Sequence, residues 1–158
     1  MNKEELNTLL NKIAQYRGVI ITDSINIEGM INSIIINYFV KEEKHSKFLM
    51  NVVSDEYFSF GLKINILEKL NFDIYKEFFQ DVRRVNNIRN IFAHCTPTLD
   101  GGLSFYNKNK KTQETKKLEE LHKEFLEKIK KVDGQLEKLF WKLVEENKRE
   151  KDKNGNKS

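Results

Sequence analysis

Three residues whose side chains can do chemistry stand within six positions of one another, in the order R-N-x-x-x-H: Arg89, Asn90 and His94. The pKa of a histidine lies near neutrality, so its imidazole can take or give a proton at physiological pH. A guanidinium stays charged and can stabilise negative charge that develops in a reaction. Together these groups could serve acid–base chemistry beside a developing anion, with the asparagine orienting the imidazole.

A helix over residues 74–94 is expected to carry these side chains. At 100° per residue, Asn90 and His94 share one face, whereas Arg89 lies about 140° from His94. Arg89 and His94 can therefore converge only if the helix ends at His94 or if a second subunit supplies the opposite wall. Arg83 and Asn87 extend the face of His94, and an apolar stripe occupies nearly the opposite side: Phe78, Val85, Ile88 and Phe92.

Ordinary structural roles are open for the same residues. A histidine at a helix C-terminus is favoured because its imidazolium complements the helix dipole. An arginine beside a core stripe often pairs with a carboxylate, and an asparagine on a helix is often only solvated. Residue chemistry by itself leaves a functional and a structural interpretation of this segment both open.

The remaining elements are also expected to be helical, because the sequence has one proline and seven glycines. Apolar residues recur at helical spacing over four stretches, which predict helices at about 5–40, 59–70, 74–94 and 113–149. Their apolar stripes need a shared core, so we expect an all-α, up-and-down bundle of four to five antiparallel helices. The signal Asp100-Gly101-Gly102 predicts a short β-hairpin or loop near 96–106.

Five local signals refine these elements. A kink is expected near Gly18, and Lys41–Lys47 is expected to be a charged linker. Asp73 is predicted to cap the helix at 74–94, and Pro97 to end it. In the helix at 59–70, either Leu62, Ile66 and Leu70 or Ile64 and Leu67 face inward.

Length and composition indicate one globular domain over residues 1–150, with a disordered tail at 151–158. Residues 107–158 carry 16 Lys and Arg against 11 Asp and Glu, whereas residues 1–106 are nearly balanced. Cys95 is the only cysteine and the histidines lack zinc-ligand spacing, so we expect no metal and no cofactor. Uninterrupted apolar runs such as Ile34–Ile36 are too short to span a bilayer, which favours a cytoplasmic location without a membrane partner.

The segment from Arg89 to His94, R-N-I-F-A-H, resembles the R-N-x-x-x-H signature of HEPN domains, small helical bundles often found as nucleases in prokaryotic defence and toxin systems. The wider segment 60–94 is similar to the mannitol operon repressor branch of that group, and the resemblance covers roughly residues 16–95. It implies a HEPN-like bundle and a metal-independent endoribonuclease that acts at the cleft of a homodimer, in a toxin–antitoxin or antiphage setting. A regulatory or antitoxin protein is an expected partner.

The resemblance also assigns roles. RNA carries its own nucleophile, the 2′-hydroxyl, and His94 has the pKa to take part in the proton transfers. Arg89 would stabilise charge on the phosphoryl oxygens and Asn90 would orient the imidazole or hold a phosphate oxygen. The products would be a 2′,3′-cyclic phosphate and a 5′-hydroxyl.

The additional RNA-binding candidates are Arg83, Arg84 and Asn87, for which surface salt bridges are the slightly favoured alternative. Lys108, Lys110 and Lys111 could touch phosphates or simply be solvated. Cys95 is expected to be structural. The alternative function is a non-catalytic HEPN or mannitol-repressor-like regulator that uses the same surface to bind nucleic acid, a nucleotide or a protein, or a plain assembly module in which Arg89 and His94 are retained for packing.

Overall fold

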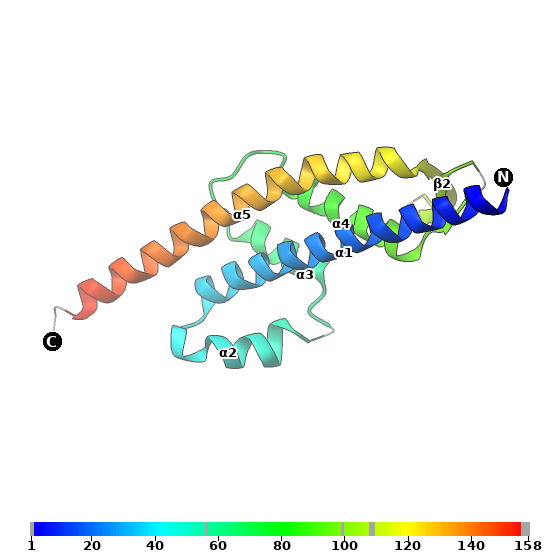
Figure 1. Ribbon diagram of the computed structural model, residues 1–158. Helices are drawn as coiled ribbons and strands as arrows, with labels where there is room; N and C mark the ends of the chain where they lie inside the picture. The colour runs from blue at the N-terminus through cyan, green and yellow to red at the C-terminus, as the bar shows by residue number, and fades with distance from the viewer. Residues whose placement is uncertain (1, 56, 99, 108–109, 156–158) are drawn as a thin grey trace. The chain divides into compact units, whose positions relative to one another are not determined.

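The computed structural model describes residues 2–55, 57–98, 100–107 and 110–155, and it is mostly helical (75%) with one small antiparallel sheet. The predicted all-α class is thereby confirmed, and Figure 1 shows the elements. The α-helices are α1 (Lys3–Phe39), α2 (His45–Phe48), α3 (Phe60–Lys69), α4 (Phe78–His94) and α5 (Leu118–Gly155). The strands are β1 (Thr96–Pro97), β2 (Gly102–Asn107) and β3 (Thr112–Lys117).

The chain forms two compact units, and each is described by itself. The first unit contains Met1–Ile25 and Asp81–Lys130, and the second contains Asn26–Gln80 and Lys131–Ser158. The candidate residues Arg83 to His94 all belong to the first unit. The single domain predicted for residues 1–150 stays a prediction.

In the first unit, the N-terminal parts of α1 and α5 lie beside α4. Ion pairs join Asp81 to Lys128 and Arg84 to Glu124, so α4 and α5 run antiparallel. Contacts of Lys12 and Tyr16 on α1 with Glu119 and His122 on α5 advance in the same direction along both helices. The expectation that all bundle helices are antiparallel is therefore wrong for α1 and α5, which run parallel here.

The core of the first unit is built from the apolar stripes of these helices. The period of 3.6 residues brings one side of each helix inward. Its buried apolar side chains are Ile13 and Ile20 of α1, Val82, Val85, Ile88, Ile91 and Phe92 of α4, and Leu118, Leu121 and Phe125 of α5, with Cys95 and Leu103 beside them. The polar side of α4 is left at the surface, as its spacing predicts.

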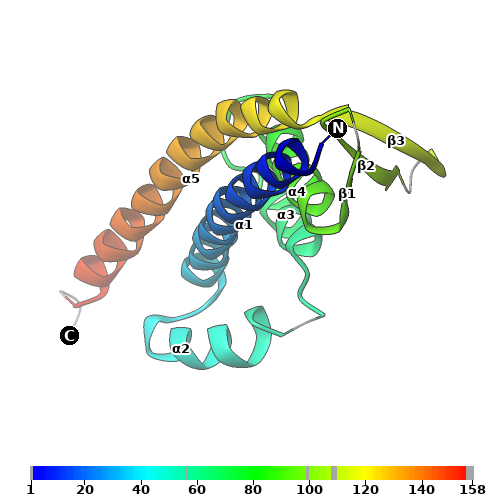
Figure 2. The same cartoon turned by 45° about the vertical axis from the view of Figure 1, so that its right-hand side comes forward.

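The sheet follows α4 directly, and Figure 2 shows it beyond the end of α4 and before the start of α5. Gly101 takes the left-handed conformation (φ 80°), and the Thr98 N–H donates to the Gly102 carbonyl at 3.0 Å. The predicted hairpin near 96–106 is thus confirmed. The third strand is a difference from the prediction: the apolar spacing predicts helix from about residue 113, but residues 112–117 pair with β2. The helix begins only at Leu118, where Glu119 and Glu120 favour its first turn.

In the second unit, α3 begins at a Ser59 N-cap, whose hydroxyl accepts from the Leu62 N–H at 3.3 Å. Ile64 and Leu67 face inward, so the second of the two predicted registers is the observed one. Buried Lys63 pairs with Glu28 of α1 at 2.6 Å. The linker at 41–47 is wrong in part, because Glu42–Lys44 form a 3₁₀ turn that leads into α2 and a π-helical turn at Leu49–Val53.

Two helix ends differ from the expectation. α1 is one helix through Gly18, as expected for residues 5–40, and a kink there stays a prediction. Asp73 does not cap α4, because Asn71 adopts a left-handed turn (φ 52°) and the helix starts only at Phe78. α5 continues to Gly155 and so includes the first residues of the predicted tail; residues 156–158 lie outside the described residues.

By length and composition, α1 could cross a membrane: its most apolar 18-residue window has a mean hydropathy of 1.4. The sequence argument from uninterrupted runs misses this helix because polar residues are spread among its isoleucines. The core helix of a soluble protein and a signal sequence meet the same criterion, and 39% of the window is buried inside the protein. The property is therefore weak support for a membrane segment.

Candidate active site on α4

The last two turns of α4 carry the three residues of the R-N-x-x-x-H segment. Asn90 and His94 are exposed and stand one turn apart on the polar side of the helix, and His94 is its last residue. Arg89 is half-buried, at the border of the core stripe formed by Ile88 and Phe92. The helix therefore arranges the three side chains as its period requires.

These side chains have no structural partner in the part of the chain that the structure describes. Neither Arg89, Asn90 nor His94 makes a hydrogen bond or an ion pair with a described residue. The carboxylate partner that the sequence left open for Arg89 is thus not found in the described residues. His94 stands at the C-terminus of α4, where the helix dipole also favours a histidine, so this structural role stays open for it. The donors and acceptors of the three side chains are available to a ligand or to a second subunit.

A side chain of α1, Arg17, holds the C-terminal end of α4. The Arg17 guanidinium donates from Nε to the Phe92 carbonyl at 2.8 Å and lies 4.0 Å from the Cys95 thiol. The Phe92 carbonyl is among the last of α4, which have no partner within the helix. The Cys95 N–H in turn donates to the Ile91 carbonyl at 2.7 Å. Backbone on both sides of His94 is therefore held, while its imidazole stays exposed.

Arg84 is already engaged inside the protein. Its guanidinium donates from Nε and Nη2 to the two carboxylate oxygens of Glu124, at 2.6 and 2.5 Å. This bond lowers the pKa of the Glu124 carboxyl. The salt bridge that the sequence left open for Arg84 is thus present, and the guanidinium is occupied. Arg83 is half-buried, whereas Asn87 is exposed on the same side as Asn90.

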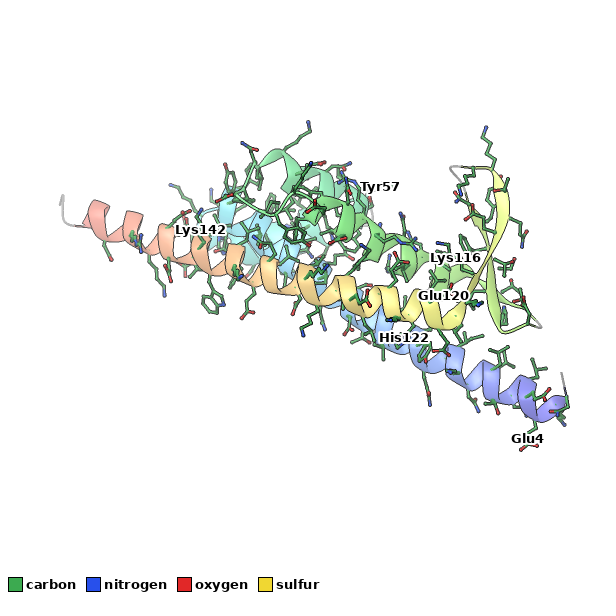
Figure 3. All side chains as sticks on the ribbon, turned by 90° about the horizontal axis from the view of Figure 1, so that it is seen from above. Glu4, Tyr57, Lys116, Glu120, His122 and Lys142 are labelled. Carbon is green, nitrogen blue, oxygen red and sulfur yellow. The ribbon has the colours of Figure 1, made fainter. Side chains whose placement is uncertain are left out.

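A second polar cluster joins α1 to α5. The rings of Tyr16 and His122 stack with centroids 3.6 Å apart, and the Tyr16 hydroxyl donates to Glu119 at 2.7 Å. Figure 3 shows His122 on the side of α5 that faces α1. Burial lowers the pKa of His122, and the bond to Glu119 raises the pKa of Tyr16. Lys12 also pairs with Glu119, so these groups satisfy one another and hold the two helices together.

A hollow of about 650 Å³ lies beside this cluster rather than at the R-N-x-x-x-H residues. It is lined by Asn2, Glu4, Glu5, Thr8, Leu9, Lys12, Gly101, Leu118 and Glu119. Across the described residues, no group of three or more His, Cys, Asp and Glu side chains is placed to hold a metal ion. The candidate site on α4 therefore consists of exposed side chains and does not line this hollow.

Sequence reasoning found the polar face of α4 but missed what supports it. Arg17 lies 75 residues before Phe92, and no local spacing links the two. The sheet that follows His94 was foreseen only as a hairpin, because the third strand contains charged residues that also suit a helix. No protein-family model, curated protein or solved structure matches this chain.

Proposed function

We propose that this chain is an endoribonuclease of the HEPN type, which cleaves RNA at a site formed by Arg89, Asn90 and His94. The observation that carries the proposal is the availability of these side chains. Asn90 and His94 are exposed one turn apart on a helix end that Arg17 anchors, and none of the three has a partner among the described residues. A buried polar group kept for packing would be paired within the chain, whereas these exposed groups can meet a ligand.

The reaction uses the nucleophile that RNA itself supplies. The 2′-oxygen forms a bond to the adjacent phosphorus as the bond from phosphorus to the 5′-oxygen breaks. The 2′-hydroxyl gives up its proton and the 5′-oxygen gains one, and His94 serves one of these two transfers. Arg89 stabilises the charge on the phosphoryl oxygens, and Asn90 orients the imidazole. The products are a 2′,3′-cyclic phosphate and a 5′-hydroxyl.

The proposed active form is a homodimer of HEPN-like bundles. Arg89 and His94 point about 140° apart on a straight helix. α4 ends at His94, and a second copy that faces this end of the helix would bring an arginine and a histidine to one phosphate. The proposed setting is the cytoplasm of a cell in which the enzyme serves toxin–antitoxin or antiphage defence, under the control of a partner protein. The basic surplus of residues 107–158 favours an RNA substrate.

The test is cleavage of a mixed RNA in buffer with EDTA by the purified chain, with products analysed for 2′,3′-cyclic phosphate ends. His94→Ala is expected to lower the rate by about 10²- to 10⁴-fold, the usual contribution of general acid–base catalysis. The unfolding temperature should not change, because the imidazole is exposed.

His45→Ala is the matched control, since His45 lies in the second unit and bonds the Val40 carbonyl at 2.7 Å. Its rate should equal that of the wild type. If the wild-type chain leaves RNA intact, the nuclease proposal fails; retained RNA binding would then support the non-catalytic regulator.

A further inference from the structure

The sheet that follows His94 has two different faces. Opposite residues of antiparallel strands lie on the same face, so Thr96, Ser104 and Thr115 form one row across the three strands. Tyr106 and Gln113 form the next row of that face, which we call the outer face. Leu103 on the other face is fully buried, whereas Tyr106, Gln113 and Thr115 on the outer face are exposed.

The outer face is chemically suited to nucleic acid. Its described side chains are hydroxyls, an amide, one amine and one phenol ring, with no carboxylate among them: Thr96, Ser104, Tyr106, Gln113, Thr115 and Lys117. Glu114, the carboxylate of β3, pairs opposite Phe105 and so belongs to the other face. In the sequence, residues 102–117 hold five lysines against this single acid. A polyanion is therefore favoured over a basic partner.

Tyr106 is the distinctive side chain of this face. It is 61% exposed, so most of its ring is free of the protein. A base of a single strand can stack on such a ring, whereas bases inside a duplex are covered by their neighbours. The hydroxyl row beside it can donate to a ribose 2′-oxygen.

The register connects this face to the candidate site. β1 runs antiparallel to β2 with Thr96 opposite Ser104, so moving back from Thr96 toward His94 corresponds to moving from Ser104 toward Tyr106. The chain therefore enters the sheet from the Tyr106 end, directly after His94 at the end of α4. Only Cys95 lies between His94 and Thr96, so the two positions are at most about 7 Å of chain apart.

We infer that the outer face binds single-stranded RNA, with a base stacked on Tyr106, and so presents the adjoining nucleotides to His94. This inference rests on the proposed ribonuclease function and adds to it a substrate class, unpaired RNA. Lys117 on this face and Lys111, exposed at the β2–β3 turn, supply attraction for the phosphates. Lys117 now pairs with Glu120 in a surface ion pair, in which a phosphate can replace the carboxylate.

The test is the affinity of the full chain for a labelled 2′-O-methyl oligouridylate, which stays single-stranded and lacks the nucleophile for cleavage. Tyr106→Ala should raise the dissociation constant by about five- to hundredfold, the range of base–aromatic stacking. Tyr106→Phe keeps the ring and should bind within about twofold of the wild type. Tyr57→Ala is the matched control, because Tyr57 is 84% exposed but belongs to the second unit.

Several outcomes overturn the inference: no binding by the wild-type chain, equal loss in the Tyr106→Ala and Tyr57→Ala proteins, unchanged affinity in the Tyr106→Ala protein, or tighter binding of a blunt RNA duplex. Cleavage of unmodified RNA is measured in parallel. If the chain cleaves RNA and Tyr106→Ala has no effect on binding, the inference about the outer face fails and the nuclease proposal stands. If RNA binds through Tyr106 but is not cleaved, the inference about the outer face stands and the nuclease proposal fails.

Discussion

The segment of α4 that contains Asp81 and Arg84 is paired with α5. Asp81 accepts from Lys128 and Arg84 donates to Glu124, each within 2.6 Å. In its last two turns, the same helix presents Arg89, Asn90 and His94 without a partner among the described residues. The two segments have similar polar composition and lie on one continuous helix. The two segments differ in whether α5 supplies an oppositely charged partner for their polar side chains.

This difference separates residues that hold the fold from residues that are available for chemistry. A paired, partly buried charge is costly to remove because its partner is left behind. An exposed group without a partner can be removed with little effect on stability. The two segments of α4 should therefore respond to mutation in opposite ways, and three substitutions test the contrast, from the largest effect to the smallest.

Arg89→Ala should lower the rate of RNA cleavage by about 10²- to 10³-fold, because a fixed donor to the developing charge is lost. The free energy of unfolding should change by less than about 1 kcal/mol, since no ion pair breaks and only the stem of the side chain is packed. Rates and urea unfolding are measured on the same preparation. Arg89→Lys keeps the charge without the planar guanidinium, so its cleavage rate should lie between those of the wild type and Arg89→Ala. A large loss of stability with an unchanged rate would make Arg89 a structural residue.

Lys128→Met should destabilise the chain by about 2 to 3 kcal/mol, somewhat below the range for a fully buried pair because Lys128 is partly exposed. The substitution keeps the apolar stem and removes the ammonium that lies 2.5 Å from the buried Asp81 carboxylate. Urea unfolding measures the loss, and RNA cleavage well below the melting temperature should be unchanged. Lys123→Met, at an exposed position of the same helix, is the control and should have no effect.

Glu124→Gln should cost about 0.5 to 1 kcal/mol at pH 7, since the pair with Arg84 is partly exposed to solvent. Arg84 lowers the pKa of the Glu124 carboxyl from its ordinary value of 4.5. The stabilisation is thus complete above pH 4.5 and is lost as the pH falls through the lowered pKa. Unfolding at neutral and acid pH should show the wild type and variant converging in acid. Exposed Glu127→Gln should show no such convergence.

The sequence was sufficient for the features that depend on local periodicity. The polar side of α4 and the burial of Val85, Ile88 and Phe92 follow from the helical repeat. The turn at Gly101 follows from the need for a residue that tolerates positive φ. Both features are determined by residues that are close together in the sequence.

Other features depend on partners that are remote in the sequence. The anchoring of α4 by Arg17 and the pairing of Arg84 with Glu124 join residues 75 and 40 positions apart. The third strand escaped prediction because Thr112–Lys117 is polar and charged and becomes a strand only by pairing with β2. Tertiary context, rather than intrinsic preference, decides the structure of that segment.

Cys95 is the only thiol of the chain, and it is buried beside the Phe92 carbonyl and the Arg17 guanidinium at the end of α4. A thiol reagent can reach it only when that end of the helix opens transiently. The rate of labelling at Cys95 therefore counts the opening events of the segment that carries His94. Labelling of Cys95 thus reports the local opening of the candidate site in the unmodified chain. A cysteine introduced at an exposed position would react before Cys95 and could carry a spectroscopic probe.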